Sequence, residues 1–187
     1  MQYDLVAPFT WISPTAFAFQ TKNEPIAAAT RLLLGADGSM TRAIEMLRQT
    51  SVALEVRGQE QVPIDPEWAA FLATEPLQPA IARRVWLTAA GRREVFAESM
   101  IPLAGLAPEL RAAIELRRQP LGLALGEDAL PSAKDRVGIG RVRVGVDLGR
   151  HGLEIGRLLW ARRYRLAVPG RLTAAIVEIL GPNLSDA

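Results

Sequence analysis

The amino-acid sequence predicts an α+β fold, with a single antiparallel β-sheet and helices packed on one face of it. Apolar residues recur at helical spacing between residues 25 and 49, and at a two-residue period in most of the segments that follow. One further helical segment lies between the strand segments, near the middle of the chain. Helices that precede a run of hairpin-linked strands are typical of the α+β class.

The composition is that of an ordinary globular chain. Its 187 residues are 49% hydrophobic and 22% charged, and this length suits one domain with a proper core. We therefore expect a single domain over residues 1–187. Basic residues exceed acidic ones by only two, 22 against 20, and are scattered along the chain. Because no Lys/Arg-rich block with interleaved aromatics occurs, we expect no nucleic-acid partner.

The sequence has no cysteine and one histidine, His151. It therefore lacks disulfides, thiolate nucleophiles and thiolate metal ligands. A histidine-rich metal site is also impossible, and a Ser-His-Asp triad would have to use His151. This residue stands between Arg150 and Gly152 in a glycine-rich stretch. We expect it to be a solvated loop residue, and we expect no metal site.

Two features bear on the location of the protein. No apolar run approaches the ~18 residues that a membrane span needs. The N-terminus, MQYDLVAPFTWISP, lacks the basic start and the small-residue cleavage site of a signal peptide. We therefore expect a cytoplasmic protein without a membrane span.

The first fifty residues contain an arm and two helices. Residues 1–22 show no clear period but are rich in prolines and aromatics, which predicts an extended N-terminal arm that packs aromatic rings onto the body. Asn23 can cap a helix that opens at Pro25 and stops at Gly35. Ser39 can cap a second helix, with the sequence SMTRAIEMLRQ.

Strands dominate the next fifty residues. Residues 52–57 alternate between two faces, as expected for a half-buried strand. Residues 62–79 contain four prolines around the sequence WAAFLA, which predicts a loop with a helical turn. Two further strands are expected at 82–88 and 94–101, joined near Gly91.

The last third of the chain ends in a hairpin. Before it we expect a helix over 107–118 and one or two strands over 136–146. The hairpin itself, Leu158–Pro182, turns at Pro169-Gly170, a pair that favours a tight turn. Its second strand, Leu172–Leu180, is apolar on both faces. Such a strand is normally central in its sheet and covered on both sides.

Glu178 interrupts this apolar strand. A buried carboxylate without a partner costs several kcal/mol, so Glu178 should be protonated or should have a cationic partner. If the turn has two residues, Arg163 and Arg165 point to the same face as Glu178, and Arg163 is the nearer. Two interpretations are open at this point: a structural ion pair, or an acid or base with a shifted pKa in a closed pocket.

Three short motifs, in this order and spacing, resemble the chorismate lyase (chorismate pyruvate-lyase) family. They are Gly38-Ser39-Met40-Thr41 at the start of a helix, Pro120-Leu121-Gly122 after the mid-chain helix, and LLWARRYRL followed by the strand that contains Glu178. The resemblance covers roughly residues 30 to 184, most of the chain. It implies a ligand pocket buried under helical flaps.

The resemblance also implies site residues. The arginine that binds the substrate carboxylate corresponds to Arg83, with Arg84 as the competitor; Arg83 shares its face with apolar neighbours, as a pocket residue should. Met40 and Leu121 correspond to residues that offer their backbone to the ligand. Glu178 corresponds to the acidic residue of the last strand, and Arg83 and Glu178 are therefore the expected catalytic residues.

The implied reaction converts chorismate to 4-hydroxybenzoate and pyruvate, usually for ubiquinone synthesis. It requires no metal, no cofactor and no covalent nucleophile, because the loss of pyruvate aromatises the ring. It requires an arginine fork for a carboxylate and a carboxyl group that can handle a proton near the 4-oxygen. We expect a monomer whose partners are chorismate and the aromatic product. The alternatives are a non-catalytic small-molecule-binding domain on the same scaffold and a related lyase with another hydroxybenzoate product.

Overall fold

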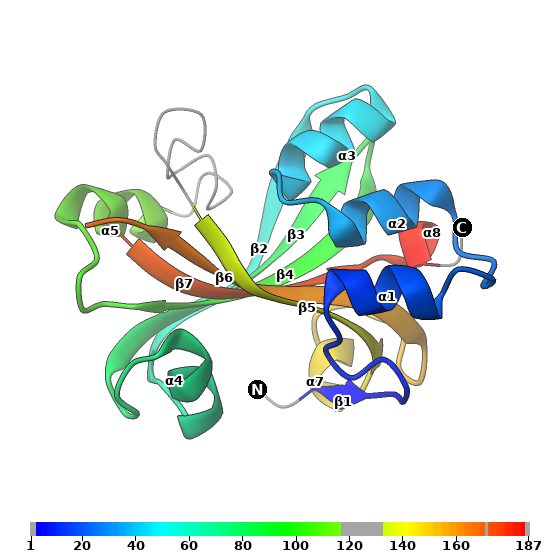
Figure 1. The fold of residues 1–187 in the computed structure, drawn as a ribbon. Helices are drawn as coiled ribbons and strands as arrows, with labels where there is room; N and C mark the ends of the chain where they lie inside the picture. Colours follow the sequence, from blue (N-terminus) through cyan, green and yellow to red (C-terminus); the bar gives the residue numbers. More distant parts are fainter. Residues whose placement is uncertain (1–2, 117–132, 171, 186–187) are drawn as a thin grey trace.

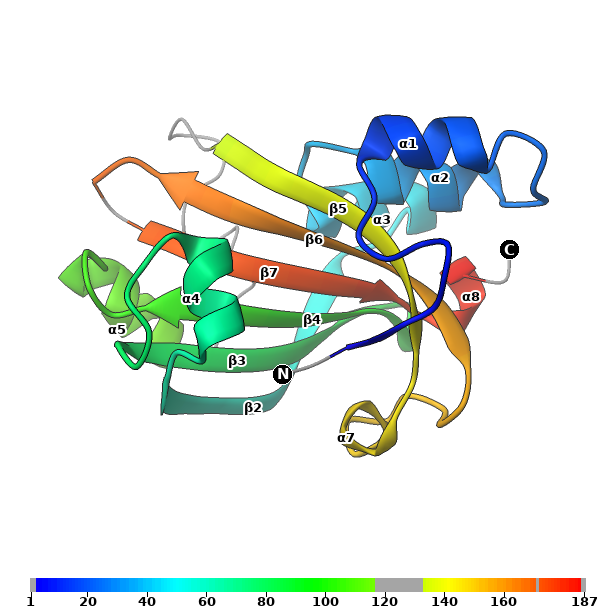
Figure 2. The same cartoon turned by 60° about the horizontal axis from the view of Figure 1, so that its bottom comes forward.

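A computed structural model describes residues 3–116, 133–170 and 172–185 (Figure 1). Its centre is one seven-stranded antiparallel sheet in the order β1-β5-β6-β7-β4-β3-β2, whose long strands lie side by side in Figure 2. The strands are β1 (Asp4–Leu5), β2 (Val52–Pro63), β3 (Pro79–Ala89), β4 (Arg92–Pro102), β5 (Ala133–Arg143), β6 (Leu158–Val168) and β7 (Leu172–Leu180). The helices are α1 (Pro14–Gln20), α2 (Ala28–Gly35), α3 (Met40–Arg48), α4 (Pro66–Leu72), α5 (Pro108–Glu115), α7 (Val146–Gly149) and α8 (Pro182–Ser185).

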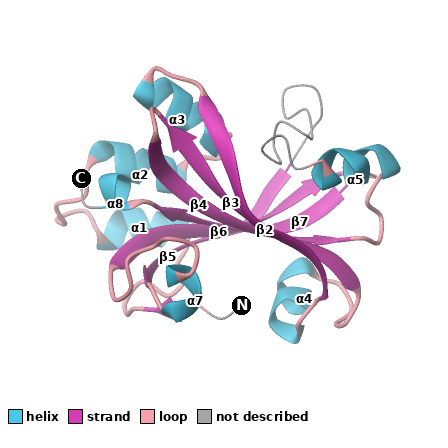
Figure 3. Ribbon diagram, turned by 180° about the vertical axis from the view of Figure 1, so that it is seen from behind, coloured by secondary structure: helices cyan, strands magenta, loops and turns pink. Residues whose placement is uncertain are grey.

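The predicted α+β class and the single antiparallel sheet are confirmed. Each strand segment expected from the two-residue period overlaps an observed strand, and each of the three expected helices overlaps an observed helix. The helices are coloured apart from the sheet in Figure 3. β7 is central, between β6 and β4, as its apolar residues on both faces predict.

The helices lie on both faces of the sheet, which corrects the expectation that one face carries them all. One face packs against α1, α2, α3, α5 and α8, and the other against α4 and α7 (Figure 1). The proline-rich stretch 62–79, expected to be a loop with one turn, contains α4. Asp65 caps this helix by accepting from the Trp68 backbone N–H at 3.0 Å. Trp68, Ala69 and Leu72 are buried against the sheet, so α4 covers an apolar face that would otherwise meet water.

The N-terminal arm is not extended throughout. It contains β1 and the helix α1, which Ser13 caps by accepting from the Ala16 backbone N–H at 3.1 Å. The expected aromatic packing is confirmed, because Phe9 and Phe17 meet the Trp160 ring edge-on, with centroids 5.0 and 5.3 Å away. The arm therefore contributes to the core on the α1–α3 side of the sheet.

The register of the last hairpin differs by one residue from a two-residue turn. Val168 pairs with Leu172, which leaves three residues between the paired positions. Arg162 therefore stands opposite Glu178 on the same face, whereas Arg163 pairs with Val177 on the other face. A one-residue shift moves every side chain of a strand to the opposite face. The expectation that Arg163 and Arg165 share the face of Glu178 is wrong for this reason.

Candidate functional site

A cavity of about 60 Å³ lies on the α3 side of the sheet. Its floor is formed by side chains of five neighbouring strands, and the start of α3 contributes to its wall. The lining residues are Ser39, Met40, Thr41, Leu54, Arg83, Val85, Leu87, Ala97, Ser99, Tyr164, Leu166, Ile176 and Glu178. Most of these are apolar, and the charged members are Arg83 and Glu178.

Strand pairing brings Arg83 and Glu178 to one cavity although they are 95 residues apart in the sequence. Glu178 of β7 pairs with Ala97 of β4, and Ala97 pairs with Val85 of β3. Arg83 is two residues from Val85 on the same strand, so it faces the same side one row further along. Met40 lines the cavity as well. Leu121, the fourth predicted site residue, lies outside the described residues.

Arg83 and its competitor Arg84 point to opposite faces of β3. Arg83 lines the cavity and is only 2% exposed. Arg84 lies on the other face, where its Nε donates to Glu98 at 2.9 Å and its Nη1 to Glu60 at 2.9 Å. Arg83, the arginine that the sequence analysis preferred, therefore lies in the cavity. Arg84 lies in an ion-pair network on the opposite face of the sheet.

Glu178 has two donors from the neighbouring strand β6. The Nε of Arg162 donates to Oε2 at 2.5 Å, and the hydroxyl of Tyr164 donates to Oε1 at 3.2 Å. Glu178 is 5% exposed and still lines the cavity. An ion pair that is this well buried satisfies the requirement for a cationic partner that the sequence posed. The partner is Arg162 rather than Arg163.

Arg162 also binds the end of α2. Its Nη1 donates to the backbone oxygens of Leu33 at 2.8 Å and Ala36 at 2.6 Å. Burial is the largest single influence on the pKa of Arg162 and would lower it, but the charges of Glu178 and Tyr164 and their hydrogen bonds together outweigh burial, and the pKa is raised above its usual value. The guanidinium therefore stays charged between a carboxylate and the negative end of a helix dipole.

Two features of the cavity favour a bound anion. One is the buried guanidinium of Arg83. The other is the first turn of α3, because Ser39, Met40 and Thr41 line the cavity and the Ser39 side chain makes no capping hydrogen bond. Backbone N–H groups at a helix N-terminus carry partial positive charge and donate hydrogen bonds to anions. A ligand carboxylate would find both features in one place.

Arg162 and Tyr164 are the residues that the sequence reasoning missed. The signal that could have found them is the register of the last hairpin. Three residues separate the paired positions 168 and 172. Because the strands are antiparallel, counting back from this pair places residue 162 opposite 178 and residue 164 opposite 176. A Pro-Gly pair does not fix the loop length by itself, so the sequence left both registers possible.

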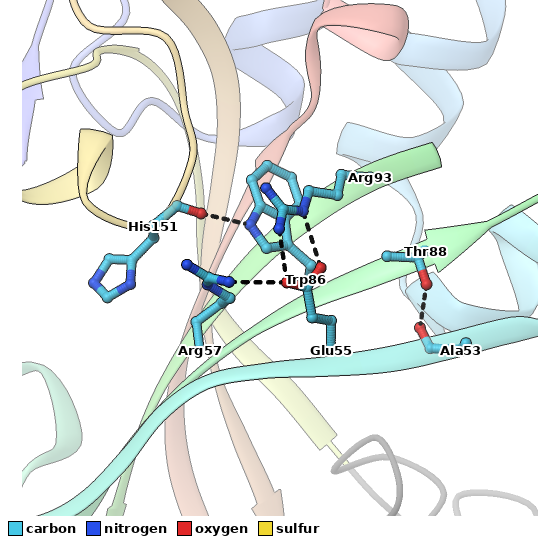
Figure 4. Close-up of polar contacts among 7 residues, drawn as sticks. All are labelled: Ala53, Glu55, Arg57, Trp86, Thr88, Arg93 and His151. Carbon is cyan, nitrogen blue, oxygen red and sulfur yellow. Dashed lines mark hydrogen bonds and ion pairs between the residues drawn. The ribbon is translucent and has the colours of Figure 1, made fainter. Parts of the chain in front are cut away.

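His151 lies next to Trp86 (Figure 4), on the face of the sheet that packs against α4 and α7, and it is not among the cavity-lining residues. Its ring stacks on Phe96 with centroids 5.4 Å apart, and its backbone oxygen accepts from Nε1 of Trp86 at 2.8 Å. It is partly buried rather than a solvated loop residue. Burial, followed by the positive charges of Arg84 and Arg57, lowers the pKa of His151.

The described residues contain no group of three or more histidine, aspartate or glutamate side chains placed to hold a metal ion. Within the same residues, no helix is long and apolar enough to cross a membrane.

Solved structures that are similar to this chain include bacterial transcriptional regulators and their effector or ligand-binding domains. The effector domain of PhnF from Mycobacterium smegmatis superposes with a TM-score of 0.62 at 13% identity, covering 78% of this chain and 90% of that chain. PhnF from the same organism gives 0.63 at 13% identity, covering 99% and 91%. A GntR-family regulator from Bacillus cereus gives 0.54 at 13% identity, covering 71% and 92%. At these identities the likeness concerns the fold alone.

The sequence itself matches a family of lyases. The family model described as chorismate pyruvate-lyase Rv2949c-like matches residues 33–187, and the chain therefore belongs to this family. The resemblance to chorismate lyases seen in the three motifs is thus confirmed at the level of the family. Comparison with curated proteins finds no match.

Proposed function

We propose that this protein is a chorismate pyruvate-lyase that converts chorismate to 4-hydroxybenzoate and pyruvate. The observation that carries the proposal is the meeting of two buried, oppositely charged side chains, Arg83 and Glu178, in one otherwise mainly apolar cavity. Membership of the chorismate pyruvate-lyase Rv2949c-like family supports it.

In the proposed complex the ring carboxylate of chorismate lies on Arg83. The guanidinium can donate two parallel hydrogen bonds to a carboxylate, and its burial strengthens them. The first turn of α3, with Met40, supplies backbone N–H groups from the same side. Leu121 is proposed to contribute its backbone, as the resemblance implies. The apolar floor, including Val85 and Ile176, meets the ring.

The reaction breaks one carbon–oxygen bond and needs no added atom. The bond between the ring carbon and the ether oxygen breaks, so that the oxygen leaves with the enolpyruvyl group; the hydrogen on the carbon that bears the 4-hydroxyl leaves as a proton, and the ring becomes aromatic. The enolpyruvyl carbon gains a proton, which gives pyruvate. Glu178, whose two oxygens accept from Arg162 and Tyr164, also accepts a hydrogen bond from the 4-hydroxyl and assists the proton transfer at that carbon.

Substrate entry requires the cavity to widen. Its volume of about 60 Å³ accommodates a few water molecules. A substrate with a six-membered ring and two carboxylates needs more room, so part of the wall must move when it binds. When the wall closes again over the bound substrate, water is excluded from around Arg83 and Glu178. The exclusion of water strengthens the interactions of both residues with the ligand. The helical flaps implied by the resemblance are part of this proposal.

The resemblance to chorismate lyases also suggests where the protein acts and what its product is used for. We propose that the protein acts as a cytoplasmic, single-domain monomer without a metal or cofactor, and that its product serves as the aromatic precursor of ubiquinone.

A second candidate function is ligand binding without turnover. The specific observation in its favour is the fold shared with the effector domain of PhnF and other regulators. In that case Arg83 would still bind an acidic ligand, and Glu178 would form only the ion pair with Arg162.

One assay separates these functions. Purified protein is incubated with chorismate, and pyruvate and the hydroxybenzoates are measured against the uncatalysed rate. The lyase proposal requires pyruvate and 4-hydroxybenzoate in equal amounts, and loss of both in Arg83→Ala. Formation of the 2- or 3-isomer would indicate a related lyase. Binding of chorismate or 4-hydroxybenzoate without turnover would support the regulator-like function.

A further inference from the structure

The carboxylate of Glu178 is fixed at both oxygens by one strand. Arg162 stands directly opposite Glu178 in the β6–β7 pairing, and Tyr164 is two residues further along β6 on the same face. Oε2 accepts from Nε of Arg162 at 2.5 Å, and Oε1 accepts from the hydroxyl of Tyr164 at 3.2 Å. The carboxylate cannot rotate without losing both hydrogen bonds, so these donors determine how it is presented to the cavity.

Arg162 acts from outside the cavity. It is 1% exposed and is not among the cavity-lining residues. Its Nη1 binds the backbone oxygens of Leu33 and Ala36 at the end of α2. The end of α2 and the carboxylate of Glu178 therefore share the guanidinium. Because Arg162 does not line the cavity, its effect on a ligand must pass through the lining residues that it contacts, Glu178 and Tyr164.

Two cations lie close to the Tyr164 ring. The Arg162 guanidinium lies 5.3 Å from the ring centroid, and the Lys134 ammonium lies 4.8 Å from it. Lys134 also donates to the backbone oxygen of Gly38 at 2.6 Å, in the connection between α2 and α3. The hydroxyl of Tyr164 is thus aimed at Glu178 by a fixed ring.

We propose that Arg162 and Tyr164 are positioning residues that keep Glu178 ionised and oriented toward the ligand cavity. The catalytic meaning of this arrangement rests on the proposed lyase function. The effect on Glu178 itself is a property of the folded protein and can be measured without turnover.

The expected effect follows from the groups around Glu178. In the described part of the chain, Arg162 and Tyr164 face it from β6, and Arg83 of β3 lines the same cavity. Removal of Arg162 would leave a buried carboxylate without its nearest cation, and such a group binds a proton more readily. Removal of the Tyr164 hydroxyl takes away one hydrogen bond to the charged form and acts in the same direction.

The test is a carboxyl ¹³C NMR titration, with the Glu178 signal assigned from the spectrum of Glu178→Gln. In Arg162→Gln, we expect Glu178 to titrate at least about one pH unit higher than in the wild type. Arg162→Lys, which keeps the charge but not the fork, should lie between them. Tyr164→Phe should give a smaller shift of the same sign. The matched control is Arg163→Gln, because Arg163 is adjacent in β6 but lies on the opposite face.

Kinetics with chorismate form the second readout. We expect kcat to fall about tenfold or more in Arg162→Gln, with partial recovery in Arg162→Lys and a smaller change in KM. An unshifted Glu178 titration would overturn the inference, whatever the activity. If the wild type lacks lyase activity but the Glu178 titration shifts as expected, the proposed function fails and the positioning stands. If the Arg162 variants do not fold, an unshifted titration in Tyr164→Phe overturns the inference.

Discussion

Arg83 and Arg84 form a matched pair for testing the site, because they are neighbours in β3 and face opposite sides of the sheet. Arg83→Ala should lower kcat/KM for chorismate by roughly 100-fold, the effect of losing a charge-assisted contact of about 3 kcal/mol. Arg83→Lys should recover part of the loss, since an ammonium lacks the planar fork. Steady-state kinetics on the two variants would measure both effects.

Arg84→Ala is the control for this experiment. It removes ion pairs with Glu98 and Glu60 behind the sheet, so it should lower the melting temperature and leave KM close to that of the wild type. A normal Arg83→Ala variant beside a crippled Arg84→Ala variant would mean that the ligand binds on the other face.

Glu178 combines a structural and a proposed catalytic role, and two substitutions separate them. Glu178→Ala leaves Arg162 buried without its carboxylate, which should cost about 3–5 kcal/mol of folding free energy and reduce kcat by at least about 100-fold. Glu178→Gln keeps the size and an acceptor for Arg162, so it should be more stable and retain more activity. Melting temperature and kcat, measured on both variants, test this.

A purely structural Glu178 would give a different result. The Ala variant would then melt at a lower temperature but turn over chorismate normally in its folded fraction. That outcome would leave Arg83 as the only functional charge of the cavity among the described residues.

His151 predicts a pH dependence of stability. Its pKa is lowered in the folded protein, by burial first and then by the charges of Arg84 and Arg57. The unfolded chain, with a histidine pKa of about 6.5, therefore binds the proton more tightly. The stabilising contribution is complete above that pH and is lost as pH falls through the folded pKa. We expect the melting temperature to drop more steeply below pH ~6.5 in the wild type than in His151→Gln.

Carboxylates titrate at lower pH in both proteins and lower both melting temperatures. The contribution of His151 is therefore the difference between the two curves of melting temperature against pH. Parallel melting curves for wild type and His151→Gln between neutral and mildly acidic pH would show that His151 does not contribute.

At the scale of elements, periodicity predicted most of the fold. The alternation at 52–57, 82–88 and 94–101 placed β2, β3 and β4, because side chains on these strands divide between two distinct environments. The apolar pattern of Leu172–Leu180 also predicted its central place in the sheet. These signals are local, so one sequence suffices to detect them.

The sequence-based predictions that were wrong or incomplete have a common physical cause: each of these features depends on tertiary contacts. The prolines around α4 favoured a loop with one helical turn over a helix. The apolar side of α4 is stabilised by the sheet face that it covers, and this contact cannot be predicted from a local pattern. The register of the last hairpin depended on one extra residue in the turn, and that residue decides whether Arg162 or Arg163 meets Glu178. The cavity residues Arg83 and Met40 were found through the family resemblance, because strand order is not readable from local patterns.

The close approach of β4 to the end of β7 gives an element-scale prediction. A Cβ on Gly181 would lie 2.8 Å from the backbone oxygens of both Arg93 and Glu94, so the strands would have to move apart. Gly181→Ala should therefore lower the free energy of unfolding by about 1–3 kcal/mol. Gly35→Ala, in α2 with nothing within 4 Å of the added carbon, should be neutral or slightly stabilising. Urea unfolding of both variants tests the contrast.

At the scale of the molecule, the two faces of the sheet have different contents. The face under α2 and α3 holds the cavity with Arg83 and Glu178. The opposite face is packed by α4 and α7 and carries ion-paired arginines. Among them are Arg84, which pairs with Glu98, and Arg93, which pairs with Glu55 in Figure 4. Both faces therefore contribute to the core, and the cavity that can bind a ligand lies on the face under α2 and α3. The same arrangement would serve a lyase or a regulator domain, which is why the fold by itself does not identify the activity.

Product binding distinguishes a closed site from an open one. 4-Hydroxybenzoate has a carboxylate for Arg83 and a hydroxyl for Glu178 at opposite ends of a flat ring, so it should fit the same cavity as chorismate. We expect it to inhibit competitively, with an affinity at least comparable to that of the substrate. Inhibition constants measured for 4-hydroxybenzoate and for benzoate, which lacks the hydroxyl, test the role of each end.

Two controls sharpen this last prediction. In Arg83→Ala both acids should bind more weakly, because both lose the carboxylate contact. In Glu178→Gln the preference for 4-hydroxybenzoate over benzoate should shrink, because an amide oxygen is a weaker acceptor for the hydroxyl than a carboxylate. An absence of inhibition at millimolar product would argue that the site is open and solvated, since a water-filled site gains little from either contact. Equal affinities for the two acids in the wild type would remove Glu178 from the ligand's contacts.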